Sequence, residues 1–145
     1  MNTISKVTEM SKNEPFVAVL SEKSEHQPLL TGYPQTGGMR SGMVNLLPGR
    51  DCGEHSTEDN EEMLIFLSGQ GQAVIGDRKT LQIGKGKIIY IPPRTIHNIM
   101  NNSNEPLCYV YCVSPTGNSF DTSTPSTSLR TDKLSINRLR TMGEK

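Results

Sequence analysis

Two histidines and one carboxylate stand at spacings that would let them act together on a metal ion. His55 lies in a polar segment and is followed seven residues later by Glu62, which directly precedes the apolar run MLIFL. His97 comes after the apolar run KIIYI and the turn that follows it. Two imidazoles and one carboxylate are a common ligand set for Zn, Fe, Mn, Ni or Cu. If both segments are strands of one small barrel, the three side chains point into the same cavity.

The residues around these three resemble the two sequence motifs of the cupin superfamily. Eight fixed positions agree in spacing across the two motifs, within about residues 45–113: Gly49, His55, Glu62, Gly69, Gly86, Pro92, His97 and Asn101. This resemblance implies an all-β, cupin-type jelly-roll barrel, often a homodimer. It also implies one divalent transition metal in the mouth of the barrel, with His55, Glu62 and His97 as its ligands.

Two positions depart from the family pattern. Thr57 stands where the first motif has its second histidine, and Arg94 stands where the second motif has a glycine. Because a threonine hydroxyl is a poor ligand, three interpretations stay open. The remaining set resembles the open 2-His-1-carboxylate arrangement that leaves room for substrate and O₂. Secondly, it equally resembles the His₂Glu set of hydrolytic zinc. In the third interpretation, the loss of one ligand has abolished metal binding.

Other polar residues near the motifs are candidates for secondary roles. Arg94 and Arg40 are candidate substrate-binding residues, because an arginine fork suits a carboxylate or phosphate. Thr57, beside the predicted ligands, is a third candidate. Glu58 and Asp59 offer carboxylates that could replace the missing ligand, and Cys52 offers a soft ligand, a redox thiol or an ordinary loop residue. His26 matches no motif and is expected to be exposed.

The elements that must position these residues are short strands. Apolar runs of strand length recur between Met39 and Val113, each closed by Gly, Pro or Asp turn residues about every ten residues. The expected strands lie in MRSGMVNLL, EMLIFL, QAVI, TLQI, KIIYI and residues 107–113. No helical period persists here and no room remains for crossover helices, so the pattern indicates an all-β sandwich or barrel.

Outside this body the chain is polar. We expect a disordered tail over residues 1–14, a barrel domain over 15–116, and a Ser/Thr-rich flexible tail over 117–145. Leu129, Ile136, Leu139 and Met142 fit one face of a short helix over 129–142. The apolar run 16–20 fits an edge strand that pairs with another subunit, which predicts a homodimer.

Composition excludes several function classes. Lys plus Arg equal Asp plus Glu at 15 each, and Trp is absent, so the chain lacks the charge and stacking surface of a nucleic-acid binder. Three cysteines without paired spacing fit a reducing, cytoplasmic setting. No apolar stretch has the length of a membrane span. The resemblance to the cupins implies a metal-dependent enzyme acting on a small polar or anionic molecule, with dioxygenase chemistry favoured over isomerase, lyase or cyclase chemistry. The alternative is a small-molecule-binding or sensing module without turnover, with no metal.

Overall fold

All regular secondary structure in the described part of the chain is β-strand. The computed structural model describes residues 13–77, 79–117 and 140–141. The strands are β1 (His26–Thr31), β2 (Arg40–Leu46), β3 (Arg50–Asp51), β4 (His55–Ser56), β5 (Asn60–Ser68), β6 (Gln70–Ile75), β7 (Lys79–Gly84), β8 (Ile88–Ile91), β9 (Ile96–Met100), β10 (Leu107–Pro115) and β11 (Arg140–Thr141). The predicted all-β, cupin-type jelly roll is confirmed.

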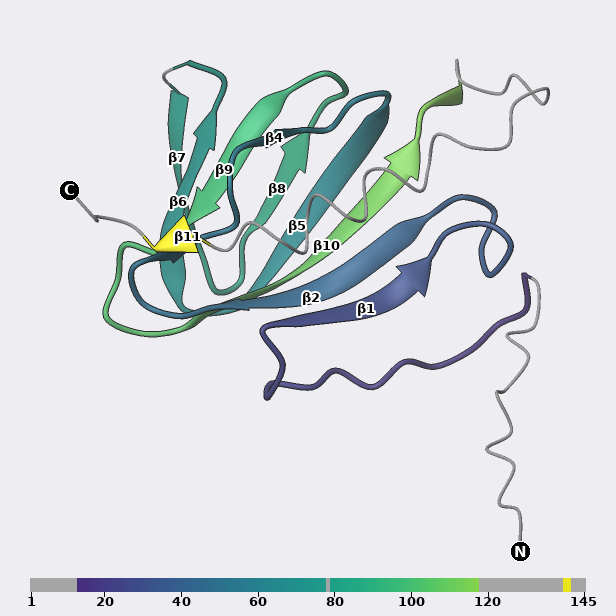
Figure 1. The fold of residues 1–145 in the computed structure, drawn as a ribbon, viewed down its shortest axis with the longest axis horizontal. Coiled ribbons are helices and arrows are strands. Elements are labelled where there is room, and N and C mark those ends of the chain that lie inside the picture. The colour runs from purple at the N-terminus through teal and green to yellow at the C-terminus, as the bar shows by residue number, and fades with distance from the viewer. Residues whose placement is uncertain (1–12, 78, 118–139, 142–145) are drawn as a thin grey trace, which may run out of the picture.

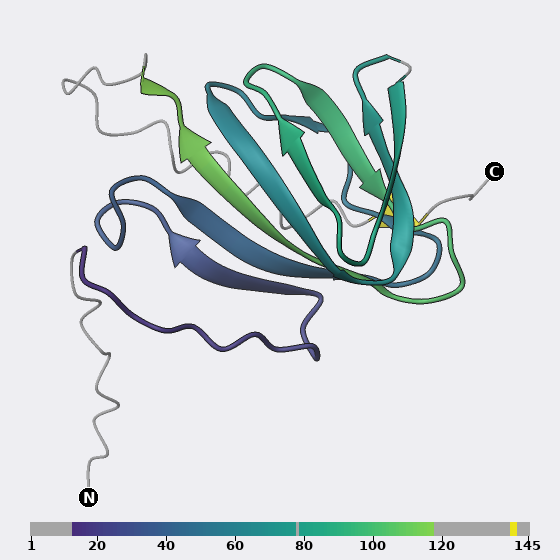
Figure 2. The ribbon, with the colours of Figure 1, turned by 180° about the vertical axis from the view of Figure 1, so that it is seen from behind.

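The strands form two antiparallel sheets that fold over each other (Figure 1). The first sheet has the order β1-β2-β10-β5-β8, and the second has the order β11-β3-β9-β6-β7, with β4 pairing to β9. Strands far apart in sequence are neighbours in both sheets. In the first sheet, for example, β10 lies between β2 and β5. Seen from behind, the long strands β2, β10 and β5 run side by side along the first sheet (Figure 2).

Alternation of side chains separates the inside of the barrel from the outside. In β5 the residues Glu62, Leu64 and Phe66 are buried, whereas Met63 between the first two and Leu67 after the third are exposed. Successive strand residues point to opposite faces, so the first three share the inner face. Burial of each apolar side chain of this size contributes about 1.5–3 kcal/mol to folding. Glu62 is therefore placed inside the barrel by the same alternation that buries its apolar neighbours.

The hydrophobic core lies between the two sheets. Its buried members come from both sheets: Val44, Leu46, Leu64, Phe66, Ala73, Ile83, Ile89, Ile91, Ile99, Leu107 and Tyr109. The centroids of the Phe66 and Tyr109 rings lie 5.5 Å apart in a tilted arrangement. Four core residues, Val44, Leu64, Ile99 and Tyr109, also line the pocket that holds the polar residues of the inner faces.

The turn between β5 and β6 requires a glycine. Gly69 has a φ of +80°, and a Cβ at this position would overlap the carbonyl oxygen of Pro106. Any other residue would strain the backbone and push this loop away. The turn reverses the chain from the first sheet into the second, so Gly69 fixes how β5 and β6 connect the two layers.

The expected strands are present, and five further strands were not expected: β1, β9 and the two-residue strands β3, β4 and β11. The runs predicted as strands correspond to β2, β5, β6, β7, β8 and β10. The sequence analysis gave no strand for β1, which carries Pro28 and an irregular register between Pro28 and Leu30. Nor did it give one for β9, whose alternation is masked by the polar residues His97 and Asn98. Residues 16–20 form no strand within the chain.

Several expectations concern the ends of the chain. The tail predicted over residues 1–14 lies outside the described residues except for 13 and 14, and the helix predicted over 129–142 lies outside them except for 140 and 141. These last two residues form β11, which pairs with Arg50 and Asp51 of β3. At these two positions the predicted helix is wrong, and over the rest of the ends disorder and helix stay predictions.

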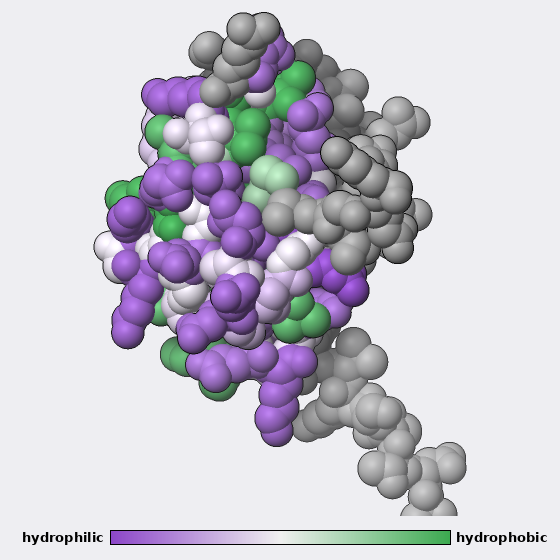
Figure 3. Space-filling view, turned by 90° about the vertical axis from the view of Figure 1, so that its left-hand side faces the viewer, coloured by the Kyte–Doolittle hydropathy of each residue, from purple (hydrophilic) through white to green (hydrophobic). Residues whose placement is uncertain are grey.

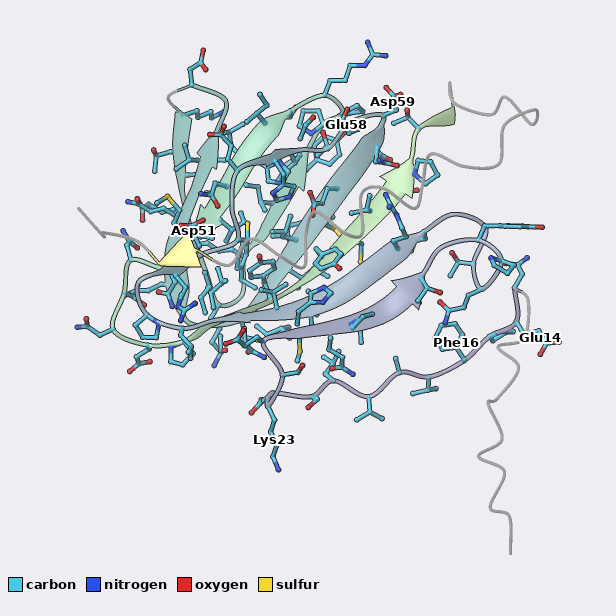
Figure 4. All side chains as sticks on the ribbon, in the orientation of Figure 1. Glu14, Phe16, Lys23, Asp51, Glu58 and Asp59 are labelled. Atoms are coloured by element: carbon cyan, nitrogen blue, oxygen red, sulfur yellow. The ribbon has the colours of Figure 1, made fainter. Side chains whose placement is uncertain are left out.

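The surface differs between the side of the barrel and the N-terminal segment. The face seen in Figure 3 is mostly hydrophilic, with hydrophobic residues in small separate groups. By contrast, Phe16 projects from an extended segment beside β1 (Figure 4), and the neighbouring Val17 and Val19 are 91% and 79% exposed. No helix in the described residues is long and apolar enough to span a membrane.

Candidate metal centre

His55 and His97 lie side by side because their strands pair in register. β4 pairs with β9 so that His55 is directly opposite His97. Residues directly opposite each other in an antiparallel pair project to the same face. The two imidazole rings are 4.2 Å apart between centroids, at an interplanar angle of 60°. His97 is 1% exposed, and His55 is half-buried.

A backbone carbonyl orients each imidazole ring. His55 Nδ1 lies 2.8 Å from the carbonyl oxygen of Gly53, and His97 Nδ1 lies 3.1 Å from that of Thr95. A carbonyl oxygen only accepts hydrogen bonds, so each Nδ1 carries the proton and donates it. In the neutral ring the lone pair is then on Nε2. This is the arrangement that fixes the tautomer of metal-binding histidines.

Glu62 approaches these rings from the opposite sheet. It is 9% exposed, and its Oε2 lies 3.1 Å from Nε2 of His97. With the His97 proton on Nδ1, the two facing atoms are both acceptors. A proton or a cation must lie between two acceptors held so closely, because their lone pairs otherwise repel each other. A positive charge between His97 and Glu62 would therefore stabilise this buried contact.

The three side chains fit a single metal ion. One ligand atom from each of His55, Glu62 and His97 lies within 4.8 Å of the others, and these residues form the one such group in the described chain. Metal–nitrogen and metal–oxygen bonds of about 2.0–2.2 Å require ligand atoms about 3–4 Å apart, so a small adjustment suffices. The donor set of two imidazoles and one carboxylate suits Zn, Fe, Mn, Ni or Cu.

The environment keeps His55 in the neutral form that binds metal. Burial lowers the pKa of His55 below its usual value, and the neighbouring imidazole of His97 lowers it further. The hydrogen bond to Gly53 and the Glu62 carboxylate oppose this shift but do not reverse it. His55 therefore presents a lone pair at neutral pH.

Thr57 lies beside the three ligands with its hydroxyl fully engaged. The hydroxyl donates to the carbonyl oxygen of Pro92 at 2.7 Å and accepts from the backbone N–H of Thr95 at 3.0 Å. Thr57 is 6% exposed and lines the pocket above the ligands. The sequence analysis named it as a candidate substrate-binding residue. The structure places it at the site, where its visible role is to hold the turn before β9.

The two arginines named from the sequence lie in different places. Arg40 lines the same pocket of about 100 Å³ as the three ligands. Arg94 does not line it: its side chain is 82% exposed, and its Nε lies 3.1 Å from a carboxylate oxygen of Asp59. Asp59 and Glu58 project together from the loop before β5 (Figure 4). Neither of these two carboxylates joins the group of three ligands.

Cys52 is a wall residue of the pocket and lies outside the group of ligands. Its Sγ accepts from the backbone N–H of Ile99 at 3.3 Å and lies 3.5 Å from Oδ1 of Asn98. Burial raises the pKa of the Cys52 thiol to about 12. The thiol is therefore neutral under ordinary conditions, and a neutral thiol is neither a metal ligand nor a nucleophile.

A histidine that the sequence analysis expected on the surface lines this pocket. His26 of β1 is half-buried, and its Nε2 lies 2.9 Å from the hydroxyl of Tyr111. The expectation of an exposed His26 was wrong. Its position follows from β1 pairing with β2, a pairing that no local pattern in HQPLLT indicates.

Comparison with known proteins identifies the family. The profile described as "Cupin domain" matches residues 42–114, which is half of the chain. The chain belongs to the cupin family. Both motifs lie within this match, and each departs from the family pattern at one position, the first at Thr57 and the second at Arg94. The matched range contains all three candidate ligands, together with Tyr109 and Tyr111 of the pocket wall.

The sequence relatives of this cupin are distant. It is 38% identical over 61 residues to the uncharacterized protein MJ1618 of Methanocaldococcus jannaschii, which is 42% of this chain and 48% of that protein. The match thus spans about half the length of that relative. It carries no activity.

Solved structures resemble the cupin in fold. BH2720 from Bacillus halodurans has a TM-score of 0.62 and 20% identity, over 73% of this chain and 87% of that one. The plu4264 protein from Photorhabdus luminescens has a TM-score of 0.60 and 15% identity, over 83% and 99%. A predicted oxalate decarboxylase from Thermotoga maritima has a TM-score of 0.53 and 18% identity, over 69% and 100%. At such identities the likeness concerns the fold alone.

Proposed function

We propose that this cupin is a metal-dependent enzyme that acts on a small polar or anionic molecule, with His55, Glu62 and His97 as the protein ligands. The observation that carries the proposal is the 3.1 Å approach of His97 Nε2 to Glu62 Oε2, in a buried site where both atoms are acceptors. A cation satisfies both lone pairs at once. His55 adds a third lone pair from the adjacent strand.

The chain's residues supply orientation as well as ligands. The carbonyls of Gly53 and Thr95 accept from Nδ1 of the two rings, which leaves both Nε2 lone pairs for a metal, and Nε2 of His97 faces Glu62. The Thr57 hydroxyl is held by the turn at Pro92 and Thr95, so it does not occupy the position of a fourth protein ligand. The site is thereby left with room for a small molecule on the pocket side.

Dioxygenase chemistry is the reaction class that we favour, ahead of isomerase, lyase or cyclase chemistry. Two imidazoles and one carboxylate that leave one side open are the ligand set of non-haem iron oxygenases. When bound, the metal supplies Lewis acidity and, where it is redox-active, chemistry with O₂. The apolar wall of Leu64, Ile99 and Val113 keeps bulk water from the carbon skeleton of a bound molecule.

Metal analysis of matched variants tests the proposal. The parent, His55→Ala, His97→Ala and Glu62→Gln are purified identically, reconstituted with Fe(II), Mn(II) or Zn(II), and measured for bound metal. Glu58→Gln is the matched control, because Glu58 is an exposed carboxylate outside the group of ligands. We expect near-stoichiometric metal in the parent and the control, and loss of most metal in the other three. Equal metal in the parent and His97→Ala would contradict the proposal.

A second function rests on a different observation. Every buried side-chain nitrogen and oxygen among the described residues has a hydrogen-bond partner without an ion. Without a metal, His97 and Glu62 would therefore serve as each other's polar partners. The chain would then act as a small-molecule-binding module without turnover. A parent protein that takes up none of the three metals, yet binds small molecules, would favour this second function.

A further inference from the structure

The inner face of the first sheet has a regular grid of side chains. Arg40 of β2 is opposite Val113 of β10, and Val113 is opposite Glu62 of β5. One step down the strands, Gly42 is opposite Tyr111, which is opposite Leu64. Directly paired residues share a face. The row of Arg40, Val113 and Glu62, called the upper row, therefore crosses the pocket from Arg40 to the metal ligand Glu62, and the row of Gly42, Tyr111 and Leu64 is called the lower row.

The two ends of the upper row are one small molecule apart. Neighbouring strands lie about 4.8 Å apart, so the backbones of Arg40 and Glu62 are separated by about 10 Å across β10. Both side chains line the same pocket, and the apolar side chain of Val113 lies between them. The Arg40 guanidinium and the three metal ligands thus lie on either side of the same short apolar surface, which Val113 forms.

The lower row places a hydroxyl beside this surface. Tyr111 lies across Gly42, where a Cβ would meet the Tyr111 hydroxyl oxygen at 2.5 Å. Because Gly42 has no side chain, the phenol reaches His26 on β1, with 2.9 Å between the hydroxyl and Nε2. The two rings are nearly parallel, at 10° and 5.9 Å. Three strands therefore cooperate to fix one hydroxyl in the wall of the pocket.

The His26 contact makes the Tyr111 hydroxyl adaptable. When Nε2 of His26 carries a proton, it donates to the phenol oxygen, and the phenol can donate its own proton into the pocket. In the other tautomer the phenol donates to Nε2, and its oxygen can only accept from a ligand. An anionic ligand selects the first arrangement, because it needs a donor.

We infer that the pocket binds small organic acids, with the carboxylate held by Arg40, a hydrogen bond from Tyr111, and the opposite oxygen of the ligand directed to His55, Glu62 and His97. Arg40 and Tyr111 are then substrate-binding residues, and His26 is a positioning residue that acts through Tyr111. The length of the upper row limits the ligand to a short carbon skeleton. This inference deepens the proposed function and rests on it only for the group at the metal end of the ligand.

The test measures binding of malonate and lactate, each against its neutral amide, by calorimetry and by NMR chemical-shift changes. Zinc-loaded and metal-free protein are both titrated. The variants are Arg40→Gln, Arg40→Lys, Tyr111→Phe and the matched control Arg94→Gln, which removes an exposed arginine outside the pocket. Thermal melting shows which variants are folded. If Arg40→Gln does not fold, Arg40→Lys and Tyr111→Phe carry the test.

We expect the parent to bind the acid at least about tenfold more tightly than the amide, since a charge-assisted hydrogen bond is lost with the amide. Arg40→Gln removes this preference, while Arg40→Lys and Tyr111→Phe weaken it. Arg94→Gln keeps it. Equal binding of acid and amide by the parent, or an unchanged preference in the folded Arg40 and Tyr111 variants, overturns the inference.

The two proposals fail separately. A parent that takes up metal through His55, Glu62 and His97 but shows no Arg40-dependent preference for acids keeps the proposed function and loses this inference. A metal-free parent whose preference for acids depends on Arg40 keeps the inference and loses the proposed enzyme.

Discussion

Thr57 and Thr95 are joined by hydrogen bonds that run in both directions. The backbone N–H of Thr57 donates to the carbonyl of Thr95 at 3.2 Å, and the backbone N–H of Thr95 donates to the Thr57 hydroxyl at 3.0 Å. The same hydroxyl donates to Pro92 at 2.7 Å. The carbonyl of Thr95 also receives the Nδ1 proton of His97. The residue at the position of the missing ligand thus holds the turn that orients a remaining one.

Replacing Thr57 by valine should destabilise the protein although the side-chain shape is nearly kept. The change leaves the N–H of Thr95 and the carbonyl of Pro92 without their partner at a partly buried position. An unpaired polar group costs about 1–3 kcal/mol when it is fully buried, so we expect a loss at the lower end of this range. Thr57→Ser keeps the hydroxyl and is the control. Chemical denaturation measures the free energy of unfolding, and similar values for the two variants would argue against the structural role of the hydroxyl.

Replacing Thr57 by histidine tests the fourth-ligand position directly. The new imidazole completes the four-ligand pattern of the family and occupies the side of the site left for a small molecule. We expect metal to be retained longer against a chelator and turnover of any substrate to fall. Thr57→Val separates the two effects, because it removes the hydroxyl and adds no ligand. Faster metal loss in Thr57→His than in Thr57→Val would show that this position does not face the ion.

Metal affinity should hold as pH falls from 8 to about 6.5, the usual pKa of histidine, and decline only below it. Burial and the neighbouring His97 lower the pKa of His55, so a proton competes with the metal only at more acidic pH. The free energy of unfolding of the metal-free protein changes with pH in the same direction as the metal affinity. The unfolded chain binds the His55 proton more tightly, so stability falls as pH drops below about 6.5.

Competition with a chromophoric chelator for Zn(II) at a series of pH values measures this profile. Urea unfolding of the metal-free protein at the same pH values measures the second effect. An affinity that already falls between pH 8 and 7 would indicate that His55 titrates above its usual pKa, contrary to the shift caused by its burial.

The sequence was sufficient to find the three candidate ligands, because all three fall on the fixed spacings of the two cupin motifs that the chain resembles. Glu62 lies seven residues before Gly69, and strand alternation in between decides its side. His97 follows the turn after β8 and is placed opposite His55 by the pairing of β4 and β9. Motif spacing can be read along the chain, whereas the pairing of β4 with β9 that brings the two histidines together is seen only in the structure.

The rest of the pocket depends on which strands are neighbours, and local patterns do not give this. His26 lies 85 positions from Tyr111 in sequence, and the two meet because β1 and β10 both pair with β2. The two candidate arginines show the same limit. Arg94 sits in a turn at a φ of +55° and reaches out to Asp59, while Arg40 faces inward through its register with Val113.

The chain should form a homodimer through its N-terminal segment. Val17 and Val19 are almost fully exposed on an extended stretch that Gln27 holds beside β1, with its Nε2 donating to the carbonyl of Val19 at 2.8 Å. A second copy that covers this stretch would remove its apolar side chains from water. The double variant Val17→Glu, Val19→Glu should be monomeric, while Lys23→Glu on the same segment should not change the state. Light scattering at micromolar concentration measures the mass, and a monomeric parent would end this prediction.

Replacing Gly42 by alanine should break the contact between Tyr111 and His26. A Cβ at this position would lie 2.5 Å from the Tyr111 hydroxyl oxygen and 2.7 Å from the ring carbon that carries it, so the phenol must move. Overpacking of this kind costs about 1–3 kcal/mol of stability. Gly37→Ala is the matched control, because nothing lies within 4 Å of its Cβ position. Urea unfolding and malonate titration should show losses in Gly42→Ala alone, since Tyr111 can no longer present its hydroxyl beside Arg40. Normal malonate binding by a destabilised Gly42→Ala variant would mean that the phenol stabilises the sheet without contacting the ligand.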